Sequence, residues 1–546
     1  MADNSARKWW ALIAIAASVV VVGLDLTVLN LALPTIATDL HASTGDLQWI
    51  SDAYSLVLAA AMLPAGLLGD RLGRKKVLLV ALVLFGASSA ACAYAANTGE
   101  LITARAVLGI GAAAIFPLSL SVIPVLFAPE ERQKAIALMA SATFISFPIG
   151  PIVGGYLLDH FWWGSVFLIN VPVVALALIA VARLLPESRS EQRPSVDILG
   201  VILSSAGLAG LTYGFIKAGQ NGWTDTAALA TIVAGVAVLA ALVAWERWLT
   251  GRYESSGAGT PRGGRGAGAL GVRPLIELRL FRSAGFTWGT TLATLVSFAM
   301  FGIFFAMPLY FQEVRGADAM GSGLRLLPMI GGMVIGMIGS TRLASPRRAA
   351  DGTASAPLAS AKGLVTAGFA IMAITLGFGA TTTISSGTGF AAAWFAVFGL
   401  GLGLAMPQAM NAALSALSAE TSGAGSALIS ALRQVGATIG VAVLGTVLSS
   451  VYRSHLVVTG LPDAVASAAK SSVVAGVAIA HKAGSATLLD SVRHAFVTGL
   501  DTMLWACAGI ALASAILAVI FLPRRADGPA ELTEASGAQE RAELEA

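Results

Sequence analysis

Three charged side chains within long apolar stretches have the clearest potential for chemistry in this sequence. Asp25 follows the predominantly apolar run that starts at Trp10, while Asp52 and Arg105 open two later runs. An ionised side chain at the centre of a bilayer costs about 2.5–3.5 kcal/mol on insertion scales, so its presence favours a function. A carboxylate whose proton affinity is balanced by burial and by a nearby cation can hold either a proton or a cationic ligand. We therefore predict that Asp25, Asp52 and Arg105 couple proton movement to ligand movement, and that both acids contact the ligand.

The three residues also have structural explanations. At about 1.5 Å per residue, Asp25 lies roughly 22 Å from the membrane surface marked by Trp10. Asp52 and Arg105 fall at a similar depth. Asp25 can simply pair with Arg105, and Asp52 can be an acid favoured by the dipole at the start of a helix. The sequence alone leaves these alternatives open.

Aromatic side chains within the apolar stretches are candidates for contacts with a cationic ligand. A cation over an aromatic ring is stabilised by about 0.5–2 kcal/mol. The candidates are Tyr54, Phe144, Phe147, Phe301, Phe305 and Tyr310. Packing inside the protein and contact with lipid explain the same residues without any ligand, so this prediction also has a structural alternative.

A run of glycines and charges at Gly66–Lys76 combines one acid and four bases with a sharp reversal between two apolar stretches. Asp70 and Arg74 have the spacing of an i,i+4 pair, if the helix continues that far. A basic anchor on one side of the membrane explains the bases but not the glycine spacing. We predict a conformational switch. Its residues are Gly66, Gly69, Asp70, Arg71, Gly73 and Arg74.

A second group of small residues lies further along the chain, at Gly150, Pro151, Gly154 and Gly155. Small residues let two membrane helices approach closely, and proline removes one backbone hydrogen bond and bends a helix. We predict a helix contact face with a bend here. Ordinary packing in a glycine-rich protein is the alternative.

The composition excludes a soluble protein. The 546 residues are 56% apolar and 12% charged, whereas soluble domains contain about 25% charged residues. The net charge is only +4, and the bases lie in short loops, which gives no surface for nucleic acid. The two cysteines, Cys92 and Cys507, lie in apolar stretches and cannot form a disulfide framework.

Fourteen stretches are long and apolar enough to cross a bilayer, which needs about 20 residues per helix. They are 10–33, 48–69, 77–96, 101–126, 135–158, 164–185, 197–217, 227–249, 285–311, 322–342, 362–382, 390–415, 425–450 and 498–522. Lys and Arg occur in alternate loops, which places both termini in the cytoplasm.

These spans predict an all-α polytopic membrane protein. Its parts are a six-helix bundle at 9–185, an inserted transmembrane helix pair at 197–249, a cytoplasmic linker at 250–283, a second six-helix bundle at 284–522 with an extracellular loop at 451–497, and a disordered cytoplasmic tail at 523–546.

Two segments outside the spans are also expected to be helical. Pro274–Arg282 has the pattern of an amphipathic helix at the membrane interface. In the extracellular loop, Ala464–Ala480 and Ala486–Thr498 are expected to form two helices, either as a lid or as a spacer without a role.

Several motifs resemble those of a known family. In chain order they are Leu24–Pro34, Gly66–Lys76, Arg105–Gly111 and Gly150–Gly155. Together they resemble the fourteen-helix drug:proton antiporter branch of the major facilitator superfamily, and Trp49–Leu58 is similar to the EmrB/QacA-like multidrug efflux transporters. The resemblance implies two six-helix bundles of the major facilitator fold, a proton-handling Arg105, and a Gly150–Gly155 motif that closes the cytoplasmic side.

The sequence departs from the family pattern in two places. Ser146 stands where the motif around Gly150 usually has a glycine. The spans at 322–342 and 425–450 contain no acidic residue, although relatives in this subgroup can have one there. Any ligand site that needs late acids, such as one for divalent cations, is therefore in doubt.

The resemblance implies a transporter and not an enzyme, without catalytic residues, metal or cofactor, and with the proton gradient as its energy source. We expect a monomer in the bacterial plasma membrane that exports lipophilic, cationic compounds in exchange for protons and binds no nucleic acid. The alternatives are a same-fold exporter of a neutral or anionic endogenous metabolite and, less favoured, a facilitator or importer.

Overall fold

The computed structural model describes residues 2–42, 44–188, 197–255, 278–345, 347–348, 354–355, 358–417, 422–458 and 461–523. The side chains of some residues inside its helices lie outside this description, among them those of Asp52, Phe144, Phe147 and Pro151. The predictions for these side chains, for the tail after residue 523 and for most of the 250–283 linker therefore stay predictions.

The N-terminal half is a bundle of helices that begins with the longest of them. Its elements are α1 (Ala2–Asp39), α2 (Thr44–Leu72), α3 (Arg74–Ala93), α4 (Thr98–Ser121), α5 (Ile123–Leu126), α6 (Pro129–His160), α7 (Ser165–Leu168) and α8 (Asn170–Leu184). Local chemistry sets several boundaries. Asn97 caps α4 by accepting a 2.9 Å hydrogen bond from the Glu100 backbone, and α4 and α5 are separated just before Pro124, which cannot donate a helical hydrogen bond.

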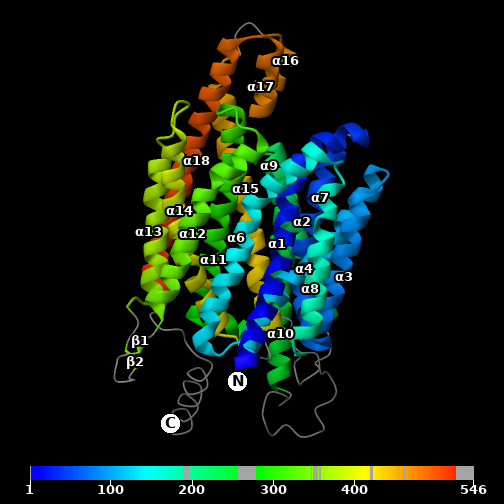
Figure 1. The fold of residues 1–546 in the computed structure, drawn as a ribbon, viewed down its shortest axis with the longest axis vertical. Helices are drawn as coiled ribbons and strands as arrows, with labels where there is room; N and C mark the ends of the chain where they lie inside the picture. Colours follow the sequence, from blue (N-terminus) through cyan, green and yellow to red (C-terminus); the bar gives the residue numbers. More distant parts are fainter. Residues whose placement is uncertain are drawn as a thin grey trace.

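The C-terminal half repeats this arrangement with an additional extension at one end. Its elements are η1 (Leu278–Arg282), α11 (Ala284–Leu309), η2 (Tyr310–Val314), α12 (Ala319–Ala344), β1 (Arg347–Arg348), β2 (Ala354–Ser355), α13 (Ala361–Gly379), α14 (Thr388–Ser415), α15 (Ser422–His455), α16 (Asp463–Ser471), α17 (Val473–Lys482) and α18 (Ala486–Phe521). The two short strands pair antiparallel between α12 and α13. In Figure 1 the two halves stand side by side with their helices roughly parallel.

Two further helices, α9 (Ile198–Asn221) and α10 (Thr226–Ser255), follow the N-terminal half. α9 packs against α2 and also against α15, so it contacts one helix from each half. α10 packs along α9 and exposes large apolar residues such as Val233 and Val236. The inserted pair therefore lies at the junction of the two halves.

Thirteen helices of the described chain are long and apolar enough to cross a membrane. They cover thirteen of the predicted spans. The predicted span at 135–158 lies within α6, which is continuous over 32 residues but is not among those thirteen. The all-α polytopic fold is thus confirmed, and the count of fourteen stays a prediction.

The structure corrects the prediction for the loop at 451–497. The expected helix at 464–480 is divided at Ser472, whose side chain caps α17. The expected second helix at 486–498 is no separate element, because it forms the first turns of α18 and runs on into the last span. α16 and α17 together form a cap, residues 463–482, that stands above the bundle at the end opposite the start of α1 (Figure 1).

Only the second part of the predicted interfacial helix at Pro274–Arg282 lies within the described chain. Residues 274–277 lie outside the described chain, and Leu278–Arg282 forms one short 3-10 helix. Ser283 then caps α11 by accepting a hydrogen bond from the Phe286 backbone. The predicted end at Arg282 thus agrees with the start of α11, and an amphipathic helix over all of 274–282 stays a prediction.

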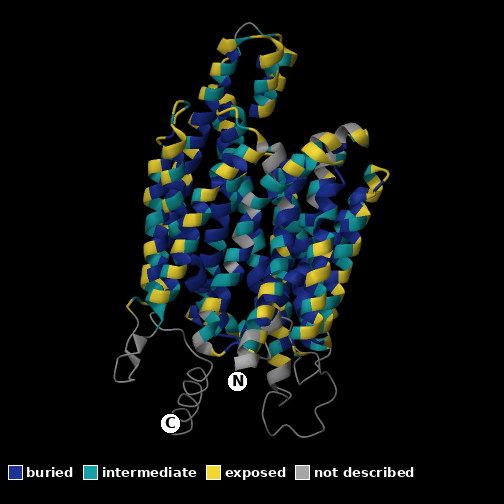
Figure 2. Ribbon diagram, viewed as in Figure 1, coloured by how far each residue is buried: buried dark blue, intermediate teal, exposed yellow. Residues whose placement is uncertain are grey.

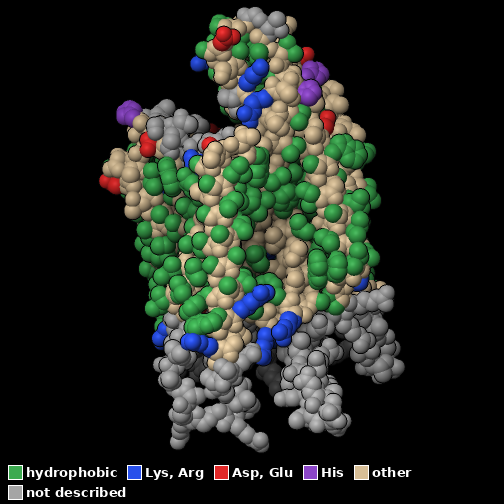
Figure 3. All heavy atoms as spheres, turned by 180° about the vertical axis from the view of Figure 1, so that it is seen from behind, with side chains coloured by type: hydrophobic (Ala, Val, Ile, Leu, Met, Phe, Trp, Pro, Cys, Tyr) green, Lys and Arg blue, Asp and Glu red, His purple; other side chains and the backbone are tan. Residues whose placement is uncertain are grey.

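The surface has the distribution expected of a protein surrounded by lipid. Buried residues face between the helices and exposed ones face outward (Figure 2), yet many outward residues are large and apolar, such as Val80, Leu176 and Ile374. Figure 3 shows apolar side chains over the middle of one face, with Lys and Arg gathered towards the end where α1 begins. An apolar belt this extensive fits contact with hydrocarbon.

Candidate functional site

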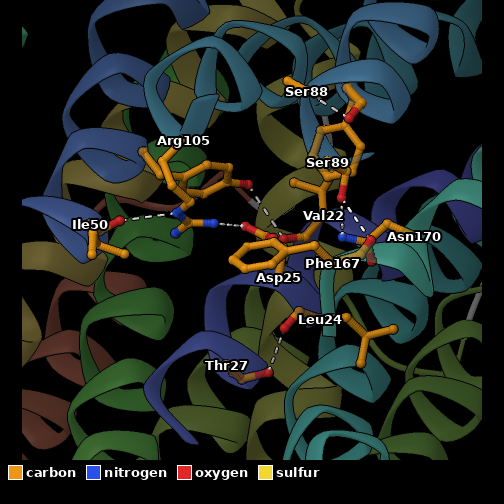
Figure 4. A network of polar contacts seen from close by, with 12 residues as sticks. Val22, Leu24, Asp25, Thr27, Ile50, Ser88, Ser89, Arg105, Phe167 and Asn170 are labelled. Atoms are coloured by element: carbon orange, nitrogen blue, oxygen red, sulfur yellow. Dashed lines mark hydrogen bonds and ion pairs between the residues drawn. The ribbon is translucent and has the colours of Figure 1, made fainter. Parts of the chain in front are cut away.

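A buried ion pair joins two of the predicted residues in the N-terminal half. The Arg105 guanidinium on α4 contacts the Asp25 carboxylate on α1, and the side chains of both are 1% exposed (Figure 4). The structure therefore contains the pair that the sequence offered as a structural explanation of Asp25, and the proton-coupling role of both residues stays a prediction. A charge at this depth is tolerated because its partner supplies the compensation that water cannot.

Further contacts hold Arg105 in one orientation. Its Nε donates a 3.0 Å hydrogen bond to the Ile50 carbonyl on α2. Its guanidinium lies 4.6 Å from the centre of the Tyr54 ring and 5.9 Å from that of Phe167. The Tyr54 hydroxyl donates a 3.5 Å hydrogen bond to the Val22 carbonyl on α1. Arg105 thus fastens α1, α2 and α4 together, and Tyr54 is part of this network.

On its other side Asp25 faces a series of hydrogen-bonded polar side chains that were not among the predicted site residues. Asn170 on α8 lies near the Asp25 carboxylate (Figure 4) and donates a 3.0 Å hydrogen bond to Ser89 Oγ. Ser89 in turn donates to the Phe167 carbonyl. The available signal was a polar Asn170 within the apolar span at 164–185, directly after Phe167-Leu-Ile.

Two cavities lie between the halves of the molecule. The central cavity is small, about 60 Å³, and includes Val19 and Gly23 of α1 together with residues of α11, α14 and α15. The second, the cap-side cavity, is about 640 Å³ and extends from Thr27 and Phe301 to Val473 below the cap. A drug-sized ligand needs about 300–1,000 Å³, so only the cap-side cavity has that room in this conformation.

The predicted aromatic residues separate into different environments. Phe301 lines both cavities and Phe305 lines the cap-side cavity. Tyr310, by contrast, is buried and donates a hydrogen bond to the Thr383 carbonyl, and Tyr54 lies beneath Arg105. Neither tyrosine is on a cavity wall, while the side chains of Phe144 and Phe147 are outside the described part of the structure.

The position of Asp25 relative to these cavities follows from the periodicity of α1. Val19, Gly23 and Thr27 are spaced by four residues and share one face of the helix, which forms part of the cavity walls. Asp25 lies on the opposite face and points into the N-terminal bundle, so the structure places it behind the wall and not on it. The Asp52 backbone belongs to α2, and its side chain is not described.

One arginine on the cavity wall was not among the predicted site residues. Arg433 of α15 lines the central cavity, and its Nε donates a 3.3 Å hydrogen bond to the Ser297 hydroxyl on α11. Among the described residues that line these two cavities, it is the only Asp, Glu, Lys, Arg or His. The signal was present in the sequence as the single Lys or Arg within the span at 425–450.

The glycine-rich run at Gly66–Lys76 forms a tight corner between α2 and α3. Arg74 donates hydrogen bonds of 2.7 and 3.1 Å to Asp70, although the helix is interrupted between them at Gly73, which has a φ of +110°. A Cβ placed on Gly73 would lie 2.5 Å from Glu187 Oε1, and the Arg74 backbone donates to the Ser188 carbonyl. The corner therefore connects the end of α2, the start of α3 and the chain after α8.

Glycines at the same spacing fasten the first helix of each half. A Cβ on Gly154 of α6 would lie 2.9 Å from Val28 of α1, and one on Gly150 would collide with Thr27. In the C-terminal half, Gly436 and Gly440 of α15 approach α11 in the same way. The predicted contact face at Gly150–Gly155 thus joins α6 to the stretch of α1 that follows Asp25.

Comparison with known proteins agrees with this geometry. The family model of the Major Facilitator Superfamily matches residues 15–441. The chain belongs to this superfamily. As a member of the Major Facilitator Superfamily it is a multi-pass membrane transporter and not an enzyme.

Two relatives are similar over most of the chain, and one solved structure shares its fold. The chain is 32% identical to the tetracenomycin C resistance and export protein of Streptomyces glaucescens, over 94% of this chain and 91% of that one. It is 33% identical to the multidrug efflux pump LfrA of Mycolicibacterium smegmatis, over 94% and 96%. The proton:xylose symporter XylE shares the fold with a TM-score of 0.58 at 14% identity, over 97% and 99% of the two chains. The relatives named for resistance and efflux agree with the resemblance found in the motifs.

Proposed function

We propose that this chain exports lipophilic compounds across the bacterial plasma membrane by exchanging them for protons through alternating access. The two relatives described above are named for export and multidrug efflux, which supports the direction of transport. The observation that carries the proton coupling is the buried pair of Asp25 on α1 and Arg105 on α4, because the other face of α1 lines both cavities.

The pair gives a route by which a proton changes the cavity wall. Protonation of Asp25 removes the negative charge that compensates Arg105, and a buried charge without its partner is strongly unfavourable. Arg105 must then find other contacts, so α1 and α4 lose their main electrostatic connection. Because Val19, Gly23 and Thr27 lie on the cavity face of α1, a shift of α1 alters the space for the cargo. Proton and cargo are thereby coupled through one helix without touching each other.

The cargo is expected to be lipophilic, since the walls of the cap-side cavity include Phe301, Phe304, Phe305 and Phe496. Aromatic walls suit a cationic compound, which is the prediction from the sequence. The described cavity walls nevertheless contain Arg433 and no carboxylate. This observation favours the second candidate, export of a neutral or anionic metabolite by the same mechanism.

The test uses energised inside-out membrane vesicles with a fluorescent pH probe. Addition of ethidium, or of an anionic dye such as fluorescein, is expected to trigger proton release from vesicles that contain the wild-type chain. Asp25→Asn is expected to abolish this release. The matched control is Asp39→Asn, an exposed acid at the end of the same helix, which should behave as wild type. Release that persists in Asp25→Asn would place the coupling elsewhere, first at Asp52.

A further inference from the structure

The surroundings of Arg433 differ from those of every other arginine discussed above. Its guanidinium faces the central cavity, where its hydrogen bond within the described structure is the one to the neutral Ser297 hydroxyl. The described acids of the same half line neither cavity; they are Glu313, Asp318, Asp463, Asp490 and Asp501. Arg433 is therefore a cation in a membrane helix without a carboxylate partner among the described side chains.

A guanidinium has five N–H donors in a planar fork that matches a carboxylate or a similar anion. One of these donors is used by Ser297, which leaves the fork available to a group that enters the cavity. Such a residue is costly in a membrane protein, and intramembrane charges of this kind mark ligand pathways. The Arg433 guanidinium can therefore donate further hydrogen bonds to an acceptor on a ligand.

The cavity geometry places Arg433 on the path of the cargo. The central and cap-side cavities share Phe301 and Gln434, and Gln434 directly follows Arg433 in the chain. A compound that moves from the α1-start end of the bundle towards the cap passes from the first cavity to the second along this shared wall. Arg433 is the only residue with a full charge that it meets there among the described wall residues.

We propose that Arg433 is the cargo-recognising residue of the central cavity and selects lipophilic compounds that carry an anionic oxygen, such as a carboxylate or a phenolate. Phe301 and Met410 on the same wall receive the apolar part of the molecule. A permanent cation is disfavoured, because it approaches a fixed positive charge without a described carboxylate to offset it. This inference deepens the proposed export function by naming the charge class of its cargo.

The test compares two xanthene dyes of similar size and opposite charge, the anion fluorescein and the cation rhodamine 123. Equilibrium binding to the purified full chain in detergent is followed by fluorescence anisotropy. We expect the wild-type chain to bind fluorescein at least tenfold more tightly than rhodamine 123, a difference of about 1.4 kcal/mol. Arg433→Gln should weaken fluorescein binding about tenfold or more and leave rhodamine 123 unchanged or bound more tightly.

Two further variants keep the result interpretable. Arg433→Lys retains the charge but not the planar fork, so its affinity for fluorescein should fall between those of wild type and Arg433→Gln, even if the latter folds poorly. Arg325→Gln, in α12 of the same half and on neither cavity wall, should leave both affinities unchanged. Tighter wild-type binding of rhodamine 123, or an equal loss of both dyes in Arg433→Gln, would overturn the proposal.

The binding measurement needs no proton gradient, which separates the two proposals. If fluorescein binds through Arg433 but releases no protons in vesicles, the antiport mechanism fails and the selectivity at Arg433 stands. If ethidium drives proton release while the purified chain shows no preference for fluorescein, the antiport stands and the selectivity at Arg433 fails.

Discussion

The two halves of the molecule share a packing design and differ in how they treat a positive charge. Each half fastens its first helix with glycines spaced by four residues, Gly150 and Gly154 in one case and Gly436 and Gly440 in the other. In the N-terminal half Arg105 is buried and contacts a carboxylate, a carbonyl and two aromatic rings. In the C-terminal half Arg433 faces a cavity and contacts one hydroxyl.

This difference indicates a division of labour. The ion pair between Asp25 and Arg105 opens only when Asp25 is protonated. It therefore responds to the proton and not to the identity of the cargo. The Arg433 guanidinium has N–H donors without a partner among the described residues, and a ligand can accept hydrogen bonds from them. The repeated helix packing permits both halves to move as similar bodies, while the charges give them different tasks.

The largest expected effect concerns the folded stability of the two arginine variants. Arg105→Gln leaves the Asp25 carboxylate buried without its partner, so we expect a loss of about 3–5 kcal/mol. Arg433→Gln removes one hydrogen bond to a hydroxyl, which is expected to cost about 1 kcal/mol or less. Thermal unfolding of the two purified variants measures the difference directly.

A double variant sharpens this comparison. Asp25→Asn combined with Arg105→Gln removes both charges, and the double variant should therefore be more stable than the sum of the single losses predicts, by about 0.5–3 kcal/mol. Its transport should nevertheless be uncoupled from protons. Equal losses of stability for Arg105→Gln and Arg433→Gln would contradict the division between the halves.

The next prediction tests whether the glycine contacts between α6 and α1 are as tight as those between α15 and α11. A Cβ on Gly440 collides with the backbone carbonyl of Phe298, whereas a Cβ on Gly154 meets the Val28 side chain at 2.9 Å. Side chains can rotate away but backbone cannot. We expect Gly440→Ala to cost about 1–3 kcal/mol as an overpacked contact and Gly154→Ala to cost less. The measurement is again thermal unfolding.

Gly331 of α12 supplies the control for this pair, since a Cβ there meets nothing within 4 Å. Gly331→Ala should therefore be close to wild type or slightly more stable. A larger loss for Gly154→Ala than for Gly440→Ala would show that the α1–α6 contact, and not the α11–α15 contact, is the more rigid of the two.

The smallest expected effect lies at the corner after α2. Gly73 and Gly222 both have positive φ, +110° and +94°, with an extended ψ that non-glycine residues rarely combine with it, so alanine strains either site by on the order of 1 kcal/mol. Only at Gly73 does the new Cβ also meet a neighbour, Glu187. Gly73→Ala should thus lose transport rate beyond its loss of stability, and Gly222→Ala should lose stability alone. If Gly73→Ala and Gly222→Ala have equal transport rates at matched stability, the corner has no part in the switching mechanism.

The amino-acid sequence was sufficient to find the membrane spans and the charged residues that are unusual within them. Hydropathy over about 20 residues is a local property, so the spans and the unusual charges at Asp25 and Arg105 could be found without coordinates. The glycine motifs were visible for the same reason, because close helix approach needs small side chains at fixed spacing. The continuity of α18 was missed, since a helix leaving the membrane loses its apolar pattern but not its backbone hydrogen bonds.

Which of these residues contact one another depends on the packing of the folded chain. Asp25 and Arg105 are 80 positions apart, and their contact depends on the depth and rotation of two helices, which no local pattern specifies. The same applies to α9, whose place between α2 and α15 follows from packing with helices more distant in the chain. Arg433 differs from Arg105 for this reason as well. Both are arginines in apolar helices, and only the neighbours supplied by the fold make one a closed pair and the other an open site.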